Sequence, residues 1–250
     1  MKKALLIALF VFAFIQLKAQ SFEFSVQAGS GLSHFTGSSS ASTSYMIGAP
    51  GGTDNYTNNP YGNRTATAYS AGLQGQYVFK SRFIVGLQAN YQLLQSKVKI
   101  DSVSRTDLYQ TLAPGPNYAY DGMEPATGQT TLKASYINLS PYIGYRVLAG
   151  KIKLDVLPGM DIGFGLGSHE NGKATTAFSS NNVTLDADKD LGTPKTDVGL
   201  RLGLAAYYHR YGLTAGYSYG LSNYLSGVVS DGTTSLHTEL FRLGISYKIN

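Results

Sequence analysis

The stretch "GSHEN" is the place in the chain where residue types best suit catalysis. It puts Ser168, His169 and Glu170 in succession, and these are the types that supply a nucleophile, a base and an acid. Successive side chains of an extended strand point to opposite faces, so Ser168 and His169 cannot easily form a nucleophile–base pair. We therefore expect a polar rim at this position and no enzymatic activity.

The stretch "DADKDLG" at residues 186–192 has carboxylates at a spacing that suits a metal ion. Asp186, Asp188 and Asp190 alternate as they do at the start of a calcium loop. The glycine falls one position late, and the last carboxylate is an aspartate where a glutamate is expected. This pattern favours a solvated acidic loop, with binding of a divalent cation as the open alternative.

A histidine and a carboxylate also meet in one predicted strand, where His237 and Glu239 share a face. They could ligate a metal, but the four histidines of the chain are scattered and form no recognisable ligand cluster. The absence of cysteine excludes a disulfide framework and a lipid-modified N-terminal cysteine. We expect neither a metal centre nor another cofactor.

The first twenty residues have the features of an export signal. Lys2 and Lys3 precede an apolar run over residues 4–17, which only Gln16 interrupts. This run is shorter than the roughly 20 residues of a membrane-spanning helix and has the length of a signal-peptide core. We predict a signal peptide over 1–20 and one mature domain over 21–250, with a single N-terminal anchor as the alternative.

The composition argues against a nucleic-acid partner and against an ordinary soluble surface. Removal of Lys2, Lys3 and Lys18 lowers the formal net charge from +5 to +2, so the basic character comes mostly from the export signal. Charged residues make up 14% of the chain, whereas soluble domains contain about 25%. Glycine and tyrosine are abundant instead, which is unusual for a surface that faces water.

Apolar and polar residues alternate with period two in eight places after Gln20, and no long stretch has helical periodicity. The predicted strands cover residues 22–35, 68–79, 82–99, 131–147, 151–169, 195–208, 211–224 and 237–250. Tight turns follow the second, fourth and sixth strands. Long polar connections follow the others, over residues 36–67, 100–130, 170–194 and 225–236. Outer-membrane barrels alternate short periplasmic turns with long external loops in this way. The sequence therefore predicts an all-β fold, an eight-stranded antiparallel transmembrane β-barrel with long external loops and short periplasmic turns.

The two faces of the predicted strands differ in side-chain size. In the last strand Phe241, Leu243, Ile245, Tyr247 and Ile249 oppose Arg242, Gly244, Ser246 and Lys248. An eight-stranded barrel is just wide enough for its own side chains, so a lumen needs very small residues beside large polar ones. The glycines of "YGLTAGYSYG" at 211–220 would then leave room for Tyr142, Arg201 and Tyr207, while the apolar face meets lipid.

Charged residues of inward parity predict a polar network in the lumen, since buried charges must pair or reach water. Asp161 and Arg201 lie on neighbouring predicted strands at similar heights above the short turns, so we expect them to pair. A hydrogen-bonded plug is favoured, and a narrow ion or solute path is the alternative. The predicted network consists of Glu23, Arg82, Arg146, Asp155, Asp161, Arg201 and Arg242, and Lys153, Asp197 and Lys248 share its parity.

The end of the chain, "RLGISYKI", resembles the assembly signal of small outer-membrane β-barrels. Arg242, Gly244, Tyr247 and Ile249 stand at the expected steps, although the chain ends in Asn250 and not in an aromatic residue. With the export signal, the eight strands and the loop asymmetry, the chain resembles this family, OmpA-like in the transmembrane part and PorT-like in layout. The resemblance implies a location in the outer membrane of a Gram-negative envelope. It also implies contacts with outer-membrane lipid, lipopolysaccharide and the barrel assembly machinery.

The expected function is that of a non-enzymatic integral outer-membrane barrel, structural or partner-binding through its external loops and rims. A protein partner would contact polar, tyrosine-containing loops such as 36–67 and 100–130, and no nucleic acid is expected. One alternative is a narrow pore or a component of a protein secretion system, which the PorT-like resemblance implies. The other is a lipid A-modifying enzyme, for which the chain lacks a His-x-Ser pairing of the deacylase kind.

Overall fold

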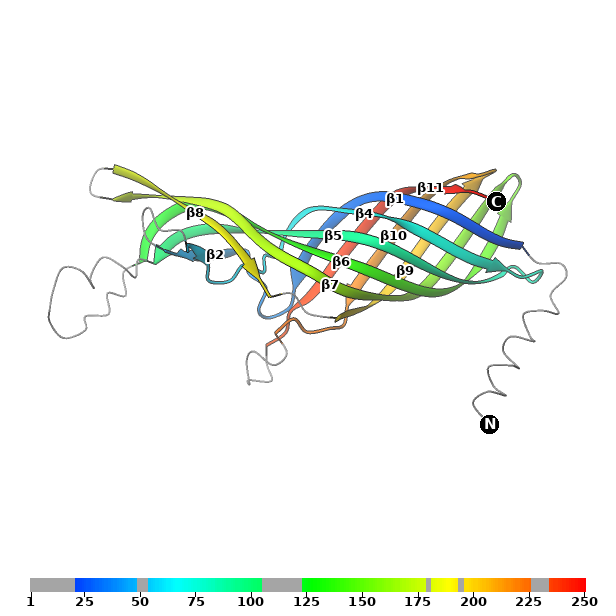
Figure 1. Ribbon diagram of the computed structural model, residues 1–250, viewed down its shortest axis with the longest axis horizontal. Coiled ribbons are helices and arrows are strands. Elements are labelled where there is room, and N and C mark those ends of the chain that lie inside the picture. Colours follow the sequence, from blue (N-terminus) through cyan, green and yellow to red (C-terminus); the bar gives the residue numbers. More distant parts are fainter. Residues whose placement is uncertain (1–20, 49–53, 105–122, 179–180, 193–195, 226–233) are drawn as a thin grey trace, which may run out of the picture.

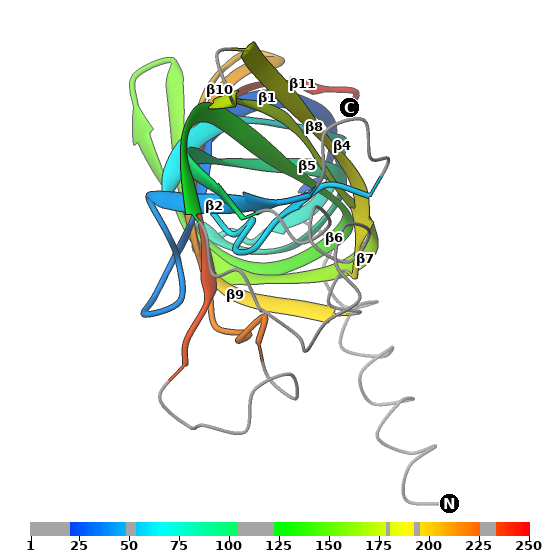
Figure 2. The same ribbon diagram turned by 90° about the vertical axis from the view of Figure 1, so that its left-hand side faces the viewer.

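A closed ring of eight antiparallel strands forms the body of the protein (Figures 1 and 2). The computed structural model describes residues 21–48, 54–104, 123–178, 181–192, 196–225 and 234–250. The ring consists, in order, of β1 (Ser21–Thr36), β4 (Arg64–Val78), β5 (Phe83–Ser104), β6 (Met123–Ala149), β7 (Ile152–Phe178), β9 (Thr196–Tyr208), β10 (Tyr211–Gly220) and β11 (His237–Lys248). Pairing of β1 with β11 and of β5 with β6 closes it, which confirms the predicted eight-stranded barrel. The described residues include no helix that is long and apolar enough to cross a membrane.

The tight turns all lie at one end of the barrel. They join β4 to β5, β6 to β7 and β9 to β10, and the chain end at Asn250 lies at the same end (Figure 1). Gly150 and His209 adopt positive φ angles of 61° and 53° in two of these turns. The long connections leave from the opposite end, as the sequence predicts.

The outer surface of the ring is apolar, and the inner side is polar. On β10 the outward Tyr211 and Leu213 are 70% and 69% exposed, whereas Ser218 of the opposite parity is buried. The outward positions of β5 and β11 repeat this pattern with large apolar side chains. Such an apolar belt suits a strand that crosses lipid, because lipid meets its outer side chains.

Three strands continue far beyond the length that a membrane requires. β5 has 22 residues and β6 and β7 have 27 each, although about 9–11 residues cross a bilayer. Beyond the ring, β2 (Thr43–Ile47) pairs with β5 in the place that β4 leaves, and β3 (Tyr56–Thr57) pairs with β2. On the other side β8 (Asn181–Leu191) pairs with the end of β7. We call this part the external sheet, in the order β3-β2-β5-β6-β7-β8 (Figure 1).

The external sheet corrects the prediction of polar loops over 100–130 and 170–194. Within the described residues these segments are largely strand. The reason is visible in the alternation of β8, where Leu185 and Ala187 face inward between the exposed Asp186 and Asp188. Only a few apolar residues are needed to fill the inner side of this narrow sheet. The segment is therefore polar in composition although it alternates with period two, as a strand does.

Two glycines of β10 face very different surroundings inside the barrel. A Cβ atom added at Gly212 would lie 2.5 Å from the ring of Tyr207. A Cβ atom at Gly216 would have no atom closer than 3.5 Å, the carbonyl oxygen of Leu202. The first glycine is therefore required by a buried aromatic ring, whereas the second borders open space.

This contrast predicts opposite results for the same substitution at two sites of one strand. Gly212→Ala should lower the free energy of unfolding by about 1–3 kcal/mol, because the Tyr207 ring must move in a filled lumen. Gly216→Ala should leave it unchanged or raise it by less than about 1 kcal/mol. Denaturant titration of the barrel in lipid vesicles measures both values, and equal losses would contradict the assigned packing of β10.

Candidate functional site

The lumen near the short turns is filled by a network around Arg146, a residue that is 5% exposed. Its guanidinium donates two hydrogen bonds to Asp155, of 2.6 and 2.7 Å, and two to Glu23, both of 2.7 Å. Lys248 contacts Glu23 at 2.7 Å, and Gln76 donates to the same carboxylate. These five residues, the Arg146 network, join β1, β4, β6, β7 and β11 across the barrel axis.

Two tyrosines complete this level of the lumen. Tyr142 donates to the side-chain oxygen of Gln76 at 3.1 Å, and Tyr207 lies under the ammonium group of Lys248, 3.8 Å from the ring centre. Both rings are buried. Bidentate guanidinium–carboxylate pairs of this kind are among the strongest polar contacts in proteins, so the level is held rigidly closed.

A second network surrounds Asp161 farther from the short turns. Its carboxylate accepts hydrogen bonds from Ser140 and Ser218, both of 2.6 Å, and from Arg242 at 2.8 Å. Arg201 lies 3.7 Å from the same carboxylate, which is the pairing that the sequence predicts. We call these five residues the Asp161 network, and they join β6, β7, β9, β10 and β11.

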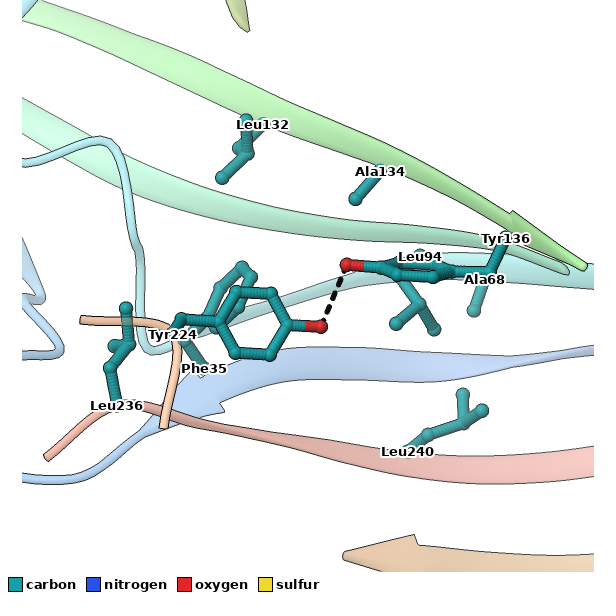
Figure 3. Close-up of a cluster of buried hydrophobic side chains, with 9 residues drawn as sticks. All are labelled: Phe35, Ala68, Leu94, Leu132, Ala134, Tyr136, Tyr224, Leu236 and Leu240. Atoms are coloured by element: carbon teal, nitrogen blue, oxygen red, sulfur yellow. Dashed lines mark hydrogen bonds between the residues drawn. The ribbon is translucent and has the colours of Figure 1, made fainter. Parts of the chain in front are cut away.

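An apolar plug with a polar centre closes the mouth opposite the short turns (Figure 3). Tyr224, in the segment after β10, meets Tyr136 of β6 with 2.8 Å between the two hydroxyl oxygens and donates to Asp197 at 2.8 Å. Burial raises the pKa of Tyr224 well above its ordinary value, so its hydroxyl keeps its proton. The plug consists of Phe35, Ala68, Leu94, Leu132, Ala134, Tyr136, Tyr224, Leu236 and Leu240.

Two small cavities interrupt the packing of the lumen. One, of about 40 Å³, borders Arg201, Arg242 and Asn90, and the other, of about 30 Å³, lies between Asp161 and Asp197. Cavities of this volume hold water molecules where polar groups surround them. In the described residues the side-chain amide of Asn90 and the Nη1 atom of Arg201 are buried without a hydrogen-bond partner. Water in the cavity would satisfy these polar atoms.

The structure places the predicted network residues at two levels and leaves Arg82 out of both. Arg82 is exposed in the turn before β5 with a φ angle of 70°, so the alternation that places side chains inward begins only at Phe83. Lys153 is likewise exposed at the end of the barrel with the short turns. Arg82 and Lys153 each lie two residues before the first buried inward residue of their strands, Ile84 and Asp155, so the prediction of an inward side chain is wrong at both positions. The two networks also include the neutral residues Gln76, Ser140 and Ser218, which charge alone does not predict although their inward parity indicates them.

The three candidate catalytic residues lie in succession on β7, where β7 pairs with β8 of the external sheet. The Ser168 hydroxyl donates to the backbone oxygen of Leu191 at 3.1 Å, and the His169 ring lies 2.9 Å from Asp190 and 3.1 Å from Asp188. Glu170 is fully buried on the face opposite to His169, where it accepts a hydrogen bond from the Thr57 N–H at 3.3 Å. Ser168, His169 and Glu170 therefore do not converge on one point.

The other residues considered as metal ligands each contact a different partner. Asp186 lies 3.2 Å from Lys173, and Glu239 lies 3.7 Å from His34. The His237 ring approaches the backbone oxygen of Ser222 at 3.1 Å. Among the residues that the structure describes, no three histidine or acidic side chains come together as a metal site.

The external sheet has its own hydrophobic core. Asn55, beside β3, donates to the backbone oxygen of Asp186 in β8 at 3.1 Å, and Lys189 lies over the ring of Tyr56 at 4.2 Å. These contacts bring the two edges of the sheet together, so that it curls around its interior. The core consists of Met46, Val98, Ile100, Val103, Ala174, Leu185 and Ala187. The external sheet is therefore a folded structure with its own core, where the sequence predicts polar loops.

The residues of the predicted assembly signal take two orientations. Arg242 faces inward to Asp161, and Gly244 pairs with Gly29 of β1 and Thr214 of β10. The outward residues Tyr247 and Ile249 are exposed near the short turns. Recognition by an assembly machinery stays a prediction.

Comparison with known proteins places this barrel in a family. The model of the family "Outer membrane protein beta-barrel domain" matches residues 16–226. The chain belongs to this family. As an outer membrane β-barrel domain, it lies in the outer membrane, with the short turns on the periplasmic side and the external sheet outside the cell. No curated protein matches the sequence significantly.

Two solved structures from Neisseria are similar in layout at low sequence identity. Neisserial surface protein A (NspA) is 12% identical, covers 90% of this chain and 97% of its own, and has a TM-score of 0.35. The translocator domain of the autotransporter NalP from Neisseria meningitidis is 12% identical, with 96% of each chain covered and a TM-score of 0.18. At these values the similarity carries no role over to this chain.

Proposed function

We propose that this protein is a non-enzymatic outer-membrane barrel that binds a partner, or stabilises the envelope, through its external sheet and loops. The observation that carries this proposal is the external sheet itself, with a hydrophobic core of its own around Ile100 and Leu185. A barrel that served only as an anchor would not need strands of 22 to 27 residues. The extra length places an ordered surface outside the membrane.

The filled lumen supports this proposal over a transport role. The Arg146 network, the Asp161 network and the plug at the mouth close the interior at three levels, with side chains from all eight strands. Large pores need more strands, because eight leave space for side chains alone. A narrow pore or a component of a protein secretion system, PorT-like or otherwise, is the second candidate, and the two small cavities are the observation that favours it.

An enzymatic role has less support. The Ser168 hydroxyl and the His169 ring each bind other groups, and the buried Glu170 lies on the face of the strand opposite to the His169 ring. A lipid A-modifying enzyme would need a nucleophile and a base within hydrogen-bond reach of each other at the membrane edge. We therefore propose a binding role without chemistry.

Removal of the external sheet tests this function. Residues 37–63, 97–131 and 170–194 are replaced together by short turns, so that no half of the external core stays exposed. Ser96 and Leu132 are register partners and accept a two-residue Asn-Gly turn. We expect normal insertion into the outer membrane, because the ring and both lumen networks remain. Cross-linking in intact cells followed by mass spectrometry should then show loss of the species that the full chain captures.

The shortened barrel also defines the contrary result. Capture that survives the removal of all three segments would assign binding to the barrel wall, to the periplasmic turns or to the connection between β10 and β11, and would overturn the role of the external sheet. The heat-dependent shift of folded barrels in gels serves as the control that the shortened chain has folded.

A further inference from the structure

Four cationic side chains gather on the outside of the wall just beyond the apolar belt. Arg64 of β4 is the register partner of Lys97 of β5, and Lys99 follows on the same face. Lys133 of β6 is the partner of Gln95, one step closer to the membrane. The intervening residues of β5, such as Val98, are buried inside, so the lysines point outward. We call Arg64, Lys97, Lys99 and Lys133 the basic face.

The nearby carboxylates of β8 contact Lys173 or His169, and the exposed Asp101 lies two residues beyond Lys99 on β5. Asp186 lies 3.2 Å from Lys173, while Asp188 and Asp190 both contact His169. Within the described residues, none of the four members of the basic face has a carboxylate within 4.0 Å. The four cations of the basic face therefore form no direct ion pair with the described carboxylates.

An open groove of about 660 Å³ connects this charge with the apolar belt. Tyr91, Leu93 and Leu166 line its membrane side, and Lys133, His169 and Asp190 line its external side. Tyr91 and Leu166 are exposed large apolar residues of the belt. The groove thus offers an apolar wall for a hydrocarbon chain directly beneath a cationic edge.

The height of the basic face suits the headgroups of the outer leaflet. Lys133 lies four residues beyond the outward Ile137 on β6, which is about 13 Å along the strand and less in height because the strands tilt. Ammonium and guanidinium groups bind phosphate strongly. A cationic face that continues from a lipid-facing surface favours a lipid over a soluble acidic chain.

We propose that the basic face and the groove form a binding site for lipopolysaccharide of the surrounding leaflet. Its lipid A phosphates contact Lys97, Lys99 and Lys133, with Arg64 at the edge, and one acyl chain lies against Tyr91 and Leu166. This site lies on the outer wall and does not depend on the proposed role of the external sheet. It holds the barrel at a fixed depth and orientation in the leaflet.

The test measures binding of diphosphoryl lipid A to the full chain folded in detergent micelles. The variant Lys97→Gln/Lys99→Gln/Lys133→Gln removes three cations from the basic face. Its affinity should fall roughly 100-fold, since each cation at a membrane surface contributes about fivefold. The matched control Lys80→Gln/Lys151→Gln/Lys153→Gln removes the same charge from exposed lysines near the short turns and should bind as the unmodified chain does. Replacement of the three lysines of the basic face by arginine should preserve binding.

Each of the following results would overturn the proposal. The first is unchanged affinity of the glutamine variant of the basic face, and the second is an equal loss in the control at the short turns. The third is phosphatidylglycerol binding as tightly as diphosphoryl lipid A, which would indicate a general attraction to anionic lipid. Dephosphorylated lipid A should bind the unmodified chain and the basic-face variant equally weakly, and a difference between them would contradict the role of the phosphates.

Discussion

Arg146→Met should lower the free energy of unfolding of the barrel by about 3–5 kcal/mol, because it leaves buried carboxylates without their main cation. Asp155 is 1% exposed, and its only ion pair among the described residues is with Arg146. Glu23 keeps the contact with Lys248 but loses two hydrogen bonds of 2.7 Å. Denaturant titration of the protein in lipid vesicles measures this change.

Arg82→Met is the matched control for this prediction. Arg82 lies at the same end of the barrel, is exposed and has no ion pair among the described residues. The same substitution there should change stability by less than about 0.5 kcal/mol. If the two variants lose equal stability, water reaches Arg146 and the network does not seal the lumen.

The barrel itself was predictable because its signals are local and repeated. The eight strands begin and end within a few residues of the predicted positions, except where β5, β6 and β7 continue outward. Alternation reveals which face meets lipid, and large apolar residues such as Leu213 and Ile245 occupy most of the outward positions. The difference between short turns and long connections then gives the orientation.

The external sheet was not predictable in the same way, because its pairing is not local. β2 runs parallel to β5, and its paired residues, such as Thr43 and Lys99, are 56 or 57 positions apart in the sequence. Only the end of β4 at Arg64 makes room for this pairing. The inner residues Ala174, Leu185 and Ala187 are small or isolated among polar neighbours. Their alternation in β8 was a usable signal, but the aspartates between them suggested a loop.

The lumen was predictable in kind and only partly in detail. Parity selects Glu23, Asp155 and Arg146 as inward residues, yet it cannot show that one guanidinium binds both carboxylates, since this depends on the stagger of distant strands. Asp161 and Arg201 are on adjacent strands, so their approach could be inferred from register alone. The prediction that Arg82 faces the lumen is wrong, because Arg82 lies in a turn that interrupts the alternation of the strand.

Because the lumen is closed, we expect the barrel to conduct no steady ion current. The Arg146 network spans the barrel near the periplasmic end, and the Asp161 network spans it farther out. A cavity of about 40 Å³ lies between these levels, and one of about 30 Å³ lies beyond the Asp161 network, so neither gives a hydrated ion a continuous path. Neither network includes a residue of the external sheet, so removal of that sheet should not open the barrel.

Conductance across planar bilayers that contain the purified protein tests this account most directly. The full chain and the barrel without its external sheet should both show no steady open channels over the voltage range that the bilayer tolerates. Reproducible open channels that persist after removal of the external sheet would contradict a closed lumen and would assign the protein to the pores.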